Sequence, residues 1–178
     1  MLTPNTGHVP ENHPIRLLFT ELTERGLAQI HIHDEASVRY ISGMMLDFID
    51  LDAVYPIRDA QGVRLEHLTD LLAEAHKATE PAVRRDHFKH LGDLTLFMLG
   101  LFPERFRRRR RALSRDLYVA EGRRSYRIVA ELVRAPSEPA VFRRLADQYE
   151  RYVEGLGWVR LYIRDPFFQY MFREFGVS

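Results

Sequence analysis

Two histidines and an aspartate at one-turn spacing are the first candidates for chemistry in this sequence. His87, His90 and Asp93 stand three residues apart in the stretch HFKHLGD, which places them on one side of a helix. Imidazole and carboxylate groups are ligands of zinc and non-haem iron. The spacing therefore predicts a metal site here, and a metal-dependent or small-molecule-processing enzyme is one candidate function.

The same three residues also fit a structural role. Di-iron sites in helical bundles use Glu-x-x-His pairs, and the sequence contains no such pair. The alternatives are a core histidine that hydrogen-bonds a neighbour, with Asp93 capping or forming a salt bridge across helices, and a site for an organic ligand. We favour the structural role and expect no cofactor.

An arginine block follows this stretch. Residues 105–115 carry seven arginines and no acid, whereas residues 1–60 carry nine acids and four arginines. Guanidinium groups bind phosphates, so nucleic-acid binding is a second candidate function, although no helix-turn-helix, zinc-finger or RNA-recognition signature is present. The favoured interpretation is a solvated face that pairs with the acidic first 60 residues, within the molecule or across a dimer. The candidate contact residues are Arg105, Arg107, Arg108, Arg109, Arg110 and Arg111.

Tyrosine and glutamate form a third cluster, in the stretch YVAEGRRSY (118–126). Tyr118 and Glu121 lie on roughly one side of a helix, and Tyr126 lies one turn beyond Gly122. A buried Tyr–Glu pair can act as acid and base. More often such a pair belongs to a hydrogen-bond network between helices. Tyr118, Glu121 and Tyr126 are therefore candidate ligand-binding residues, with the network as the favoured interpretation.

Helical periodicity dominates the elements that must position these residues. Apolar stripes predict a first helix with Gly26 as its C-cap, a second from Glu35 after the N-cap Asp34, and further helices up to the last short one at 167–175. The stretches TEPAV (79–83) and SEPAV (137–141) each predict a helix start with a hydroxyl cap and an early proline. Residues 158–163, WVRLYI, suggest a short strand or an extended connection. Six or seven helices with short connections predict an all-α bundle.

The stretch from Leu91 to Phe102 is the expected centre of that bundle. It is apolar nearly all round, with Asp93 as its one charged residue, and it is shorter than the about 20 residues that span a membrane. We therefore expect a buried central helix and no membrane span. Gly92 and Gly100 would allow neighbouring helices to approach closely.

Composition and length bound the remaining possibilities. The chain has 178 residues, of which 46% are hydrophobic and 29% charged, which is typical of one globular domain. It contains no cysteine, so disulfides, thiolate metal sites and cysteine catalysis are excluded. We expect a flexible tail over residues 1–13, a single helical domain over 14–178 and a cytoplasmic location.

A longer motif adds a resemblance to a known family. The stretch LGDLTLFMLGLFPE (91–104), followed by Leu117-Tyr118 and EGRRSY (121–126), resembles a family of uncharacterised bacterial all-helical proteins with an LGD-x-x-LF-x-x-GLFP motif. The resemblance covers residues 15–135, and the arginine block of this chain is more basic than in that group. It implies a helical fold and a bacterial origin, and no reaction. The matching positions are Leu91, Gly92, Asp93, Leu96, Phe97, Gly100, Phe102, Pro103, Tyr118, Gly122 and Tyr126.

The leading functional hypothesis is a non-enzymatic interaction or regulatory protein. No nucleophile elbow, P-loop or Gly-x-Gly-x-x-Gly motif is present. We expect a homodimer, with an unidentified protein as another possible partner and nucleic acid as a less favoured one. The aromatic residues at 167–175 would pack against the core of their own chain or against a second copy.

Overall fold

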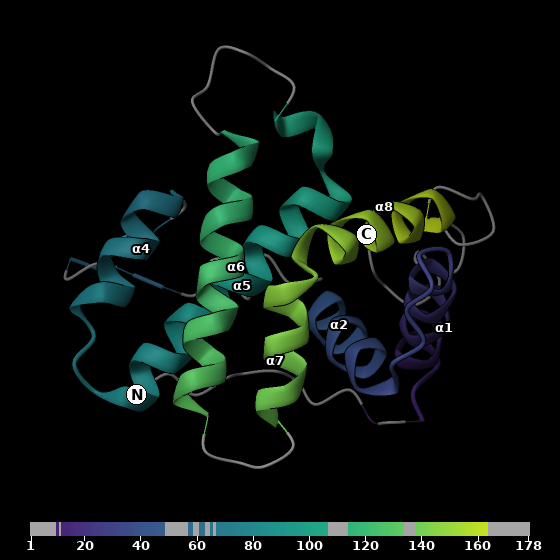
Figure 1. The fold of residues 1–178 in the computed structure, drawn as a ribbon, viewed down its shortest axis with the longest axis horizontal. Coiled ribbons are helices and arrows are strands. Elements are labelled where there is room, and N and C mark those ends of the chain that lie inside the picture. Colours follow the sequence, from purple (N-terminus) through teal and green to yellow (C-terminus); the bar gives the residue numbers. More distant parts are fainter. Residues whose placement is uncertain are drawn as a thin grey trace.

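The computed structural model of the chain is built from α-helices. It describes residues 10, 12–48, 57–58, 61–62, 65, 67–106, 114–133 and 138–163, which contain seven α-helices and one short 3-10 helix. These are α1 (Pro14–Ala28), α2 (Glu35–Asp47), α4 (Leu68–Lys77), α5 (Pro81–Leu101), η1 (Pro103–Phe106), α6 (Arg115–Leu132), α7 (Glu138–Asp147) and α8 (Tyr149–Ile163). The prediction of an all-α bundle is confirmed (Figure 1).

The helix α5 is the centre of the bundle, as the sequence predicts. It packs against α4, α6 and α8, and it lies in the middle of the molecule in Figure 1. From Leu91 to Gly100 every residue except Phe97 is buried. A helix that is apolar nearly all round needs protein on every side, and these neighbours supply it.

Two glycines of α5 let the neighbouring helices approach. A Cβ atom at Gly92 would lie 2.7 Å from the ring of Tyr126 on α6, and a Cβ atom at Gly100 would overlap the side chain of Leu156 on α8. Any larger residue at either position would force the neighbouring side chain to move. The predicted role of both glycines is confirmed.

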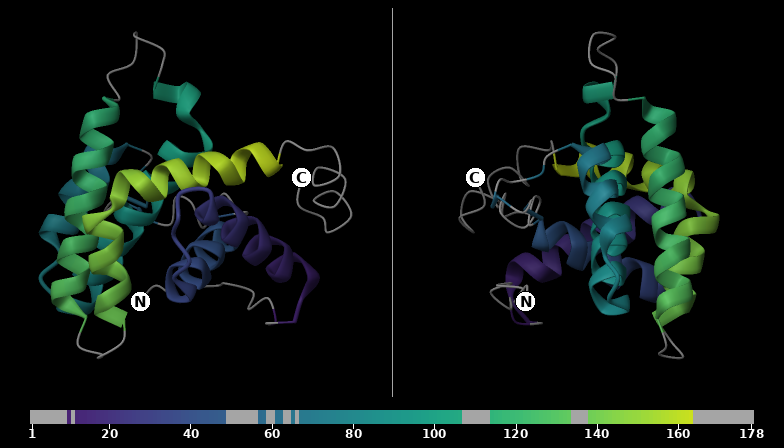
Figure 2. Two further views of the ribbon diagram at one scale, coloured as in Figure 1. Left: turned by 45° about the vertical axis from the view of Figure 1, so that its right-hand side comes forward. Right: turned by 90° about the vertical axis from the view of Figure 1, so that its left-hand side faces the viewer.

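Gly26 lies inside α1, so the prediction that it caps this helix is wrong. The helix continues to Ala28, and the chain then turns through His31, whose φ is 57°. Gly26 marks the crossing of α1 and α8, because a Cβ atom there would lie 2.8 Å from the carbonyl oxygen of Gly155. Figure 2 shows α8 lying across α1.

The helix starts follow the sequence signals in most cases. Oδ2 of Asp34 accepts a hydrogen bond from the backbone N–H of Ser37 at 3.0 Å, so Asp34 is the N-cap of α2. The helix α5 begins at Pro81, as the stretch TEPAV predicts. Its N-cap is Glu80, which makes no capping hydrogen bond through its side chain, so the expected hydroxyl cap at Thr79 is wrong.

The segment 158–163 is helical, and the prediction of a strand or an extended connection is wrong. It forms the second half of α8, whose buried residues recur at helical spacing from Tyr149 to Val159. Gly155 lies within this helix where α8 meets Leu27, since a Cβ atom there would lie 2.6 Å from the Leu27 side chain.

Several predictions concern residues outside the described ranges. They include most of the tail 1–13, the arginines at 107–111 and the helix at 167–175. Because some of these segments lie within residues 14–178, the structure describes only part of the predicted single domain. Of the helices that the structure describes, none combines the length and the hydrophobicity that crossing a membrane requires.

Candidate functional site

A buried carboxylate on α5 is the centre of the most concentrated polar cluster among the described residues. Asp93 is only 3% exposed. Its Oδ1 accepts hydrogen bonds from the hydroxyl groups of Tyr40 on α2, at 2.5 Å, and Tyr126 on α6, at 2.8 Å. Its Oδ2 accepts a hydrogen bond from Nζ of Lys89 at 2.7 Å. The carboxylate therefore joins α2, α5 and α6.

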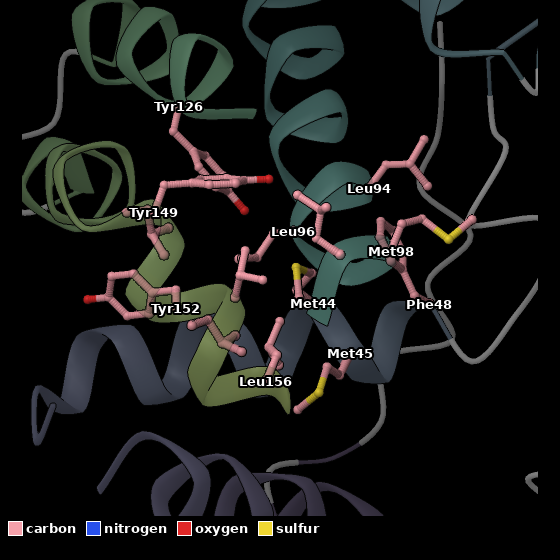
Figure 3. Close-up of a cluster of buried hydrophobic side chains, with 14 of the residues drawn as sticks. Met44, Met45, Phe48, Leu94, Leu96, Met98, Tyr126, Tyr149, Tyr152 and Leu156 are labelled. Atoms are coloured by element: carbon pink, nitrogen blue, oxygen red, sulfur yellow. The ribbon is translucent and has the colours of Figure 1, made fainter. Parts of the chain in front are cut away.

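An aromatic shell surrounds this carboxylate. The ring of Tyr40 meets that of Phe142 on α7 edge to face, with 5.1 Å between centroids, and that of Tyr126 at 6.3 Å. Tyr126 also lies 6.1 Å from Tyr149 of α8, and Figure 3 shows these two rings beside each other. These rings exclude water from the carboxylate, which strengthens the hydrogen bonds that it accepts.

The tyrosines of the cluster are held in their protonated form. Burial, and then the charge of Asp93, raises the pKa of Tyr40 and of Tyr126 well above the ordinary value. Burial also raises the pKa of Tyr149. Phenols that stay protonated serve as hydrogen-bond donors and do not act as bases near neutral pH.

Glycines make room for the cluster. The ring of Tyr126 lies directly over Gly92, so that its hydroxyl reaches the neighbouring residue Asp93. Gly122 leaves the space in which Tyr149 meets Thr95 on α5, where the two hydroxyl oxygens are 2.8 Å apart. The motif residues Gly92, Asp93, Gly122 and Tyr126, distant in sequence, therefore meet in one place.

Lys89 lies on the solvent side of the cluster. Its side chain is 42% exposed, and its Nζ lies 5.2 Å from the centroid of the Tyr40 ring. Burial lowers the pKa of Lys89, but the charge of Asp93, with those of Asp47 and Asp86, outweighs this effect and holds the pKa above its ordinary value. Lys89 is therefore a protonated ammonium at neutral pH.

A second polar network lies nearer the surface. Oδ2 of Asp34 accepts a hydrogen bond from the hydroxyl of Ser37 and pairs with Nε of Arg144 on α7 at 3.0 Å. The Ser37 hydroxyl also lies 2.8 Å from that of Tyr152 on α8. Burial raises the pKa of Asp34, but the hydrogen bonds from Ser37 and the charge of Arg144 outweigh it, and the pKa lies below its ordinary value.

The structure does not assemble the predicted metal ligands. Of the residues it describes, no three His, Asp or Glu side chains are grouped so that they could hold a metal ion. The carboxylate of Asp93 is engaged by Tyr40, Tyr126 and Lys89. The ring of His90 packs against Phe48 at 5.8 Å between centroids. Asp93 has a structural role, but its salt bridge is to Lys89 of the same helix and does not cross between helices as predicted. Its contacts to other helices are the hydrogen bonds from Tyr40 and Tyr126.

The predicted Tyr–Glu cluster on α6 is divided among three neighbours. Tyr126 bonds to Asp93 on α5. Oε2 of Glu121 lies 3.9 Å from Nη1 of Arg124, one turn along the same helix. Tyr118 packs on the ring of Phe106 at 4.8 Å. Tyr118, Glu121 and Tyr126 therefore have different contacts, and Tyr126 belongs to a buried hydrogen-bond network between helices.

The described acids of the N-terminal helices pair with arginines outside the block. Figure 1 shows η1 and the start of α6, which flank residues 107–111 in the sequence, at one end of the molecule and α1 and α2 away from it. Of the arginines at 105–115, the structure describes Arg105, which is exposed, and Arg115, which pairs with Glu150. The ion pairs of the acids in and beside α1 and α2 are Glu21 with Arg25, Asp34 with Arg144, and Glu35 with Arg39.

Comparison with known proteins gives no functional assignment for this site. No protein-family model, no curated protein and no solved structure matches the chain. The function is therefore argued from the geometry of the described residues alone.

The sequence analysis missed four residues of the buried polar contacts. Tyr40 and Lys89 donate to Asp93, and Thr95 pairs with Tyr149. A local signal existed for Lys89 only, since a lysine four residues before an aspartate is an ion-pair spacing on a helix. The bond between Tyr40 and Asp93 joins residues 53 positions apart, and that between Thr95 and Tyr149 joins residues 54 apart. Such contacts depend on how the helices pack.

Proposed function

We propose that this chain is a non-enzymatic interaction or regulatory protein of the bacterial cytoplasm that acts as a homodimer through the exposed face of α8. The observation that carries the proposal is a pair of large apolar side chains one turn apart on that helix. Trp158 is 38% exposed and Leu161 is 53% exposed. Trp158 is the only tryptophan in the sequence. Tryptophan is enriched among the residues that dominate binding energy at protein interfaces.

Two basic side chains near this end of α8 have partners within their own chain. Arg160 pairs with Glu104 at 2.8 Å, and Arg25 lies over the ring of Tyr162 at 4.9 Å. Two identical faces meet across a two-fold axis, where unpaired like charges would repel each other. Basic groups that already have partners within their own chain allow such a contact.

The polar cluster of α5 supports the same proposal. Asp93 accepts hydrogen bonds from Tyr40, Tyr126 and Lys89. The bonds from Tyr40 and Tyr126 fix α2 and α6 on α5. This is how a bundle gains a defined packing arrangement of its helices. The side chains that the sequence offers as candidates for chemistry then stabilise the fold, and a partner binds at the surface.

The single tryptophan gives a direct test of the dimer. We expect light scattering to give a dimer mass, and the emission of Trp158 to shift to shorter wavelength as protein concentration rises through the dissociation constant. Leu161→Glu should yield a monomer whose emission no longer depends on concentration. Leu117→Glu places the same charge on an exposed leucine of α6 and serves as the matched control. A wild-type protein that is monomeric at all concentrations would overturn the proposal.

A second candidate function is the binding of a polyanion by the arginine block, and one observation favours it. Glu104, the described acid directly before the block, is already paired with Arg160 of α8 at 2.8 Å. A run of guanidinium groups attracts the phosphates of a polyanion. Fluorescence anisotropy with labelled duplex and single-stranded oligonucleotides tests this candidate.

The expected result is salt-sensitive binding that Arg107→Ala and Arg109→Ala weaken together. The control replaces two arginines of α6, Arg124 and Arg127, with alanine. Equal binding by both double variants would show a nonspecific charge effect and count against the arginine block as a site.

A further inference from the structure

We infer that Asp93 and the ring of Tyr40 form a binding site for a primary ammonium group, and that Lys89 occupies this site as a tethered ligand of the same chain. The inference goes beyond the proposed function, since it concerns how α2 is held on α5. It does not depend on a dimer or on the arginine block.

The geometry around Nζ of Lys89 is that of a recognition site for an amine. One side of the ammonium donates to Oδ2 of Asp93 at 2.7 Å. Another side faces the ring of Tyr40, whose centroid is 5.2 Å away. A carboxylate combined with an aromatic face is the combination by which proteins bind alkylammonium ligands.

The site is built before the ammonium enters it. The hydroxyl of Tyr40 bonds to Oδ1 of Asp93 at 2.5 Å, which orients the ring toward the position of Nζ. Tyr126 holds the same oxygen from the opposite helix, α6, at 2.8 Å. Asp93 is 3% exposed, and a buried carboxylate is stable only beside a compensating cation or donors. Both phenols donate to Oδ1, and the ammonium of Lys89 serves Oδ2.

Lys89 is suited to act as a removable occupant. It lies one turn before Asp93 on α5, so it reaches the site without any change of backbone. Its side chain is 42% exposed, whereas the side chain of Asp93 is 5% exposed, so water reaches part of the lysine side chain and little of the carboxylate. The other charges that act on Lys89 are those of Asp47 and Asp86, which favour its ammonium form.

Vacating the site has a consequence for α2. Tyr40 links α2 to α5 through its bond to Asp93, and the charge of Lys89 stabilises the carboxylate that accepts this bond. The loss of the ammonium therefore weakens the attachment of α2. Lys89 therefore helps to hold α2 on α5. The class of ligand that replaces its ammonium in the site is a small primary alkylamine.

Chemical rescue tests this inference. Lys89→Ala removes three methylene groups and the ammonium, and propylammonium supplies the same groups. We expect Lys89→Ala to lower the melting temperature by several degrees and to speed amide hydrogen exchange in Glu35–Asp47 by about tenfold, the effect of losing about 1.4 kcal/mol. Propylammonium chloride should restore both readouts in this variant and leave the wild type unchanged.

Three controls separate the site from general effects of salt and of misfolding. Sodium chloride at equal ionic strength and tetramethylammonium chloride, which has no N–H donor, should give no rescue. The double variant Lys89→Ala with Asp93→Asn should also give none. Lys89→Met keeps the length of the side chain without its charge, so it tests the exchange of α2 if the alanine variant does not fold.

The outcomes are distinct. Rescue by propylammonium that requires Asp93 supports an ammonium site. Equal effects of propylammonium and sodium chloride, or exchange in α2 that is unchanged in both Lys89 variants, would overturn it.

Discussion

Two polar networks attach α2 to the rest of the bundle, and they differ in how deeply their carboxylates are buried. Asp93 is 3% exposed and accepts hydrogen bonds from two phenols and one lysine. The side chain of Asp34 is 32% exposed and pairs with Arg144 beside solvent. Water compensates for a lost partner at the surface and cannot do so in the interior. The network of Asp93 should therefore contribute more to the free energy of unfolding than the network of Asp34.

The largest effect is expected for Asp93→Asn. The amide keeps an oxygen that can accept from Tyr40 and Tyr126, but its N–H donors then face the ammonium of Lys89. Breaking a buried ion pair costs about 3 to 5 kcal/mol, and we expect the lower end of this range because the Lys89 side chain is partly exposed to water. Urea unfolding should show this loss in the free energy of unfolding. The corresponding change in the network of Asp34, Asp34→Asn, should lower the free energy of unfolding much less. Equal losses in the two variants would contradict the difference between the two networks.

The second effect is steric and concerns Gly92. Gly92→Ala would place a methyl group against the ring of Tyr126 and displace its hydroxyl from Asp93. We expect a loss of about 2 kcal/mol in the free energy of unfolding. Gly43→Ala in α2 is the matched control, because no atom lies within 4 Å of the place that its Cβ would take. This control should stabilise the protein by about 0.5 to 1 kcal/mol through helix propensity.

The third effect distinguishes the two hydroxyl contacts of α5. Tyr126→Phe removes a donor to a buried charge, which is worth about 1.5 kcal/mol or more. Tyr149→Phe removes a contact to Thr95, whose hydroxyl still donates to the carbonyl oxygens of Leu91 and Gly92. The loss should be smaller in the second variant. Thermal unfolding of the two variants side by side sharpens the comparison, and a larger loss for Tyr149→Phe would contradict it.

The smallest effect is the pH dependence of the stability that Asp34 contributes. The pKa of Asp34 lies below its ordinary value of 3.8, so its contribution to stability is complete above that value. It is lost as pH falls through the lower pKa of the folded state. Asp34→Asn keeps an N-cap side chain and removes the ionisation. The variant should lose less stability than the wild type between about pH 5 and pH 2. An unchanged pH profile would show that Asp34 contributes nothing by its charge.

The sequence predicts the fold better than it predicts the site, and the reason is the range of the interactions involved. Helix periodicity and the N-cap at Asp34 depend on residues a few positions apart. The central helix is recognisable because its apolar run needs no knowledge of its neighbours. The prediction for residues 158–163 is wrong because these residues continue α8, in which Gly155 serves the contact with α1.

The polar cluster illustrates what local patterns miss. Asp93 stands out in the sequence as a polar residue in an apolar run, and Tyr126 stands out beside Gly122. Their pairing with each other, and with Tyr40, depends on how α2, α5 and α6 pack. Proximity in sequence pairs Tyr126 with the carboxylate of Glu121. The structure pairs it with Asp93, 33 residues away.

A double-mutant cycle between Asp93 and Lys89 would show most clearly whether this buried carboxylate is held by donors from its own chain. The cycle uses Asp93→Asn, Lys89→Met and the double variant, with urea unfolding of all four proteins. We expect Lys89→Met to rescue Asp93→Asn in part, with a coupling energy of about 1.5 kcal/mol or more. Losses that simply add would contradict this, because they would mean that the ammonium and the carboxylate do not act on each other.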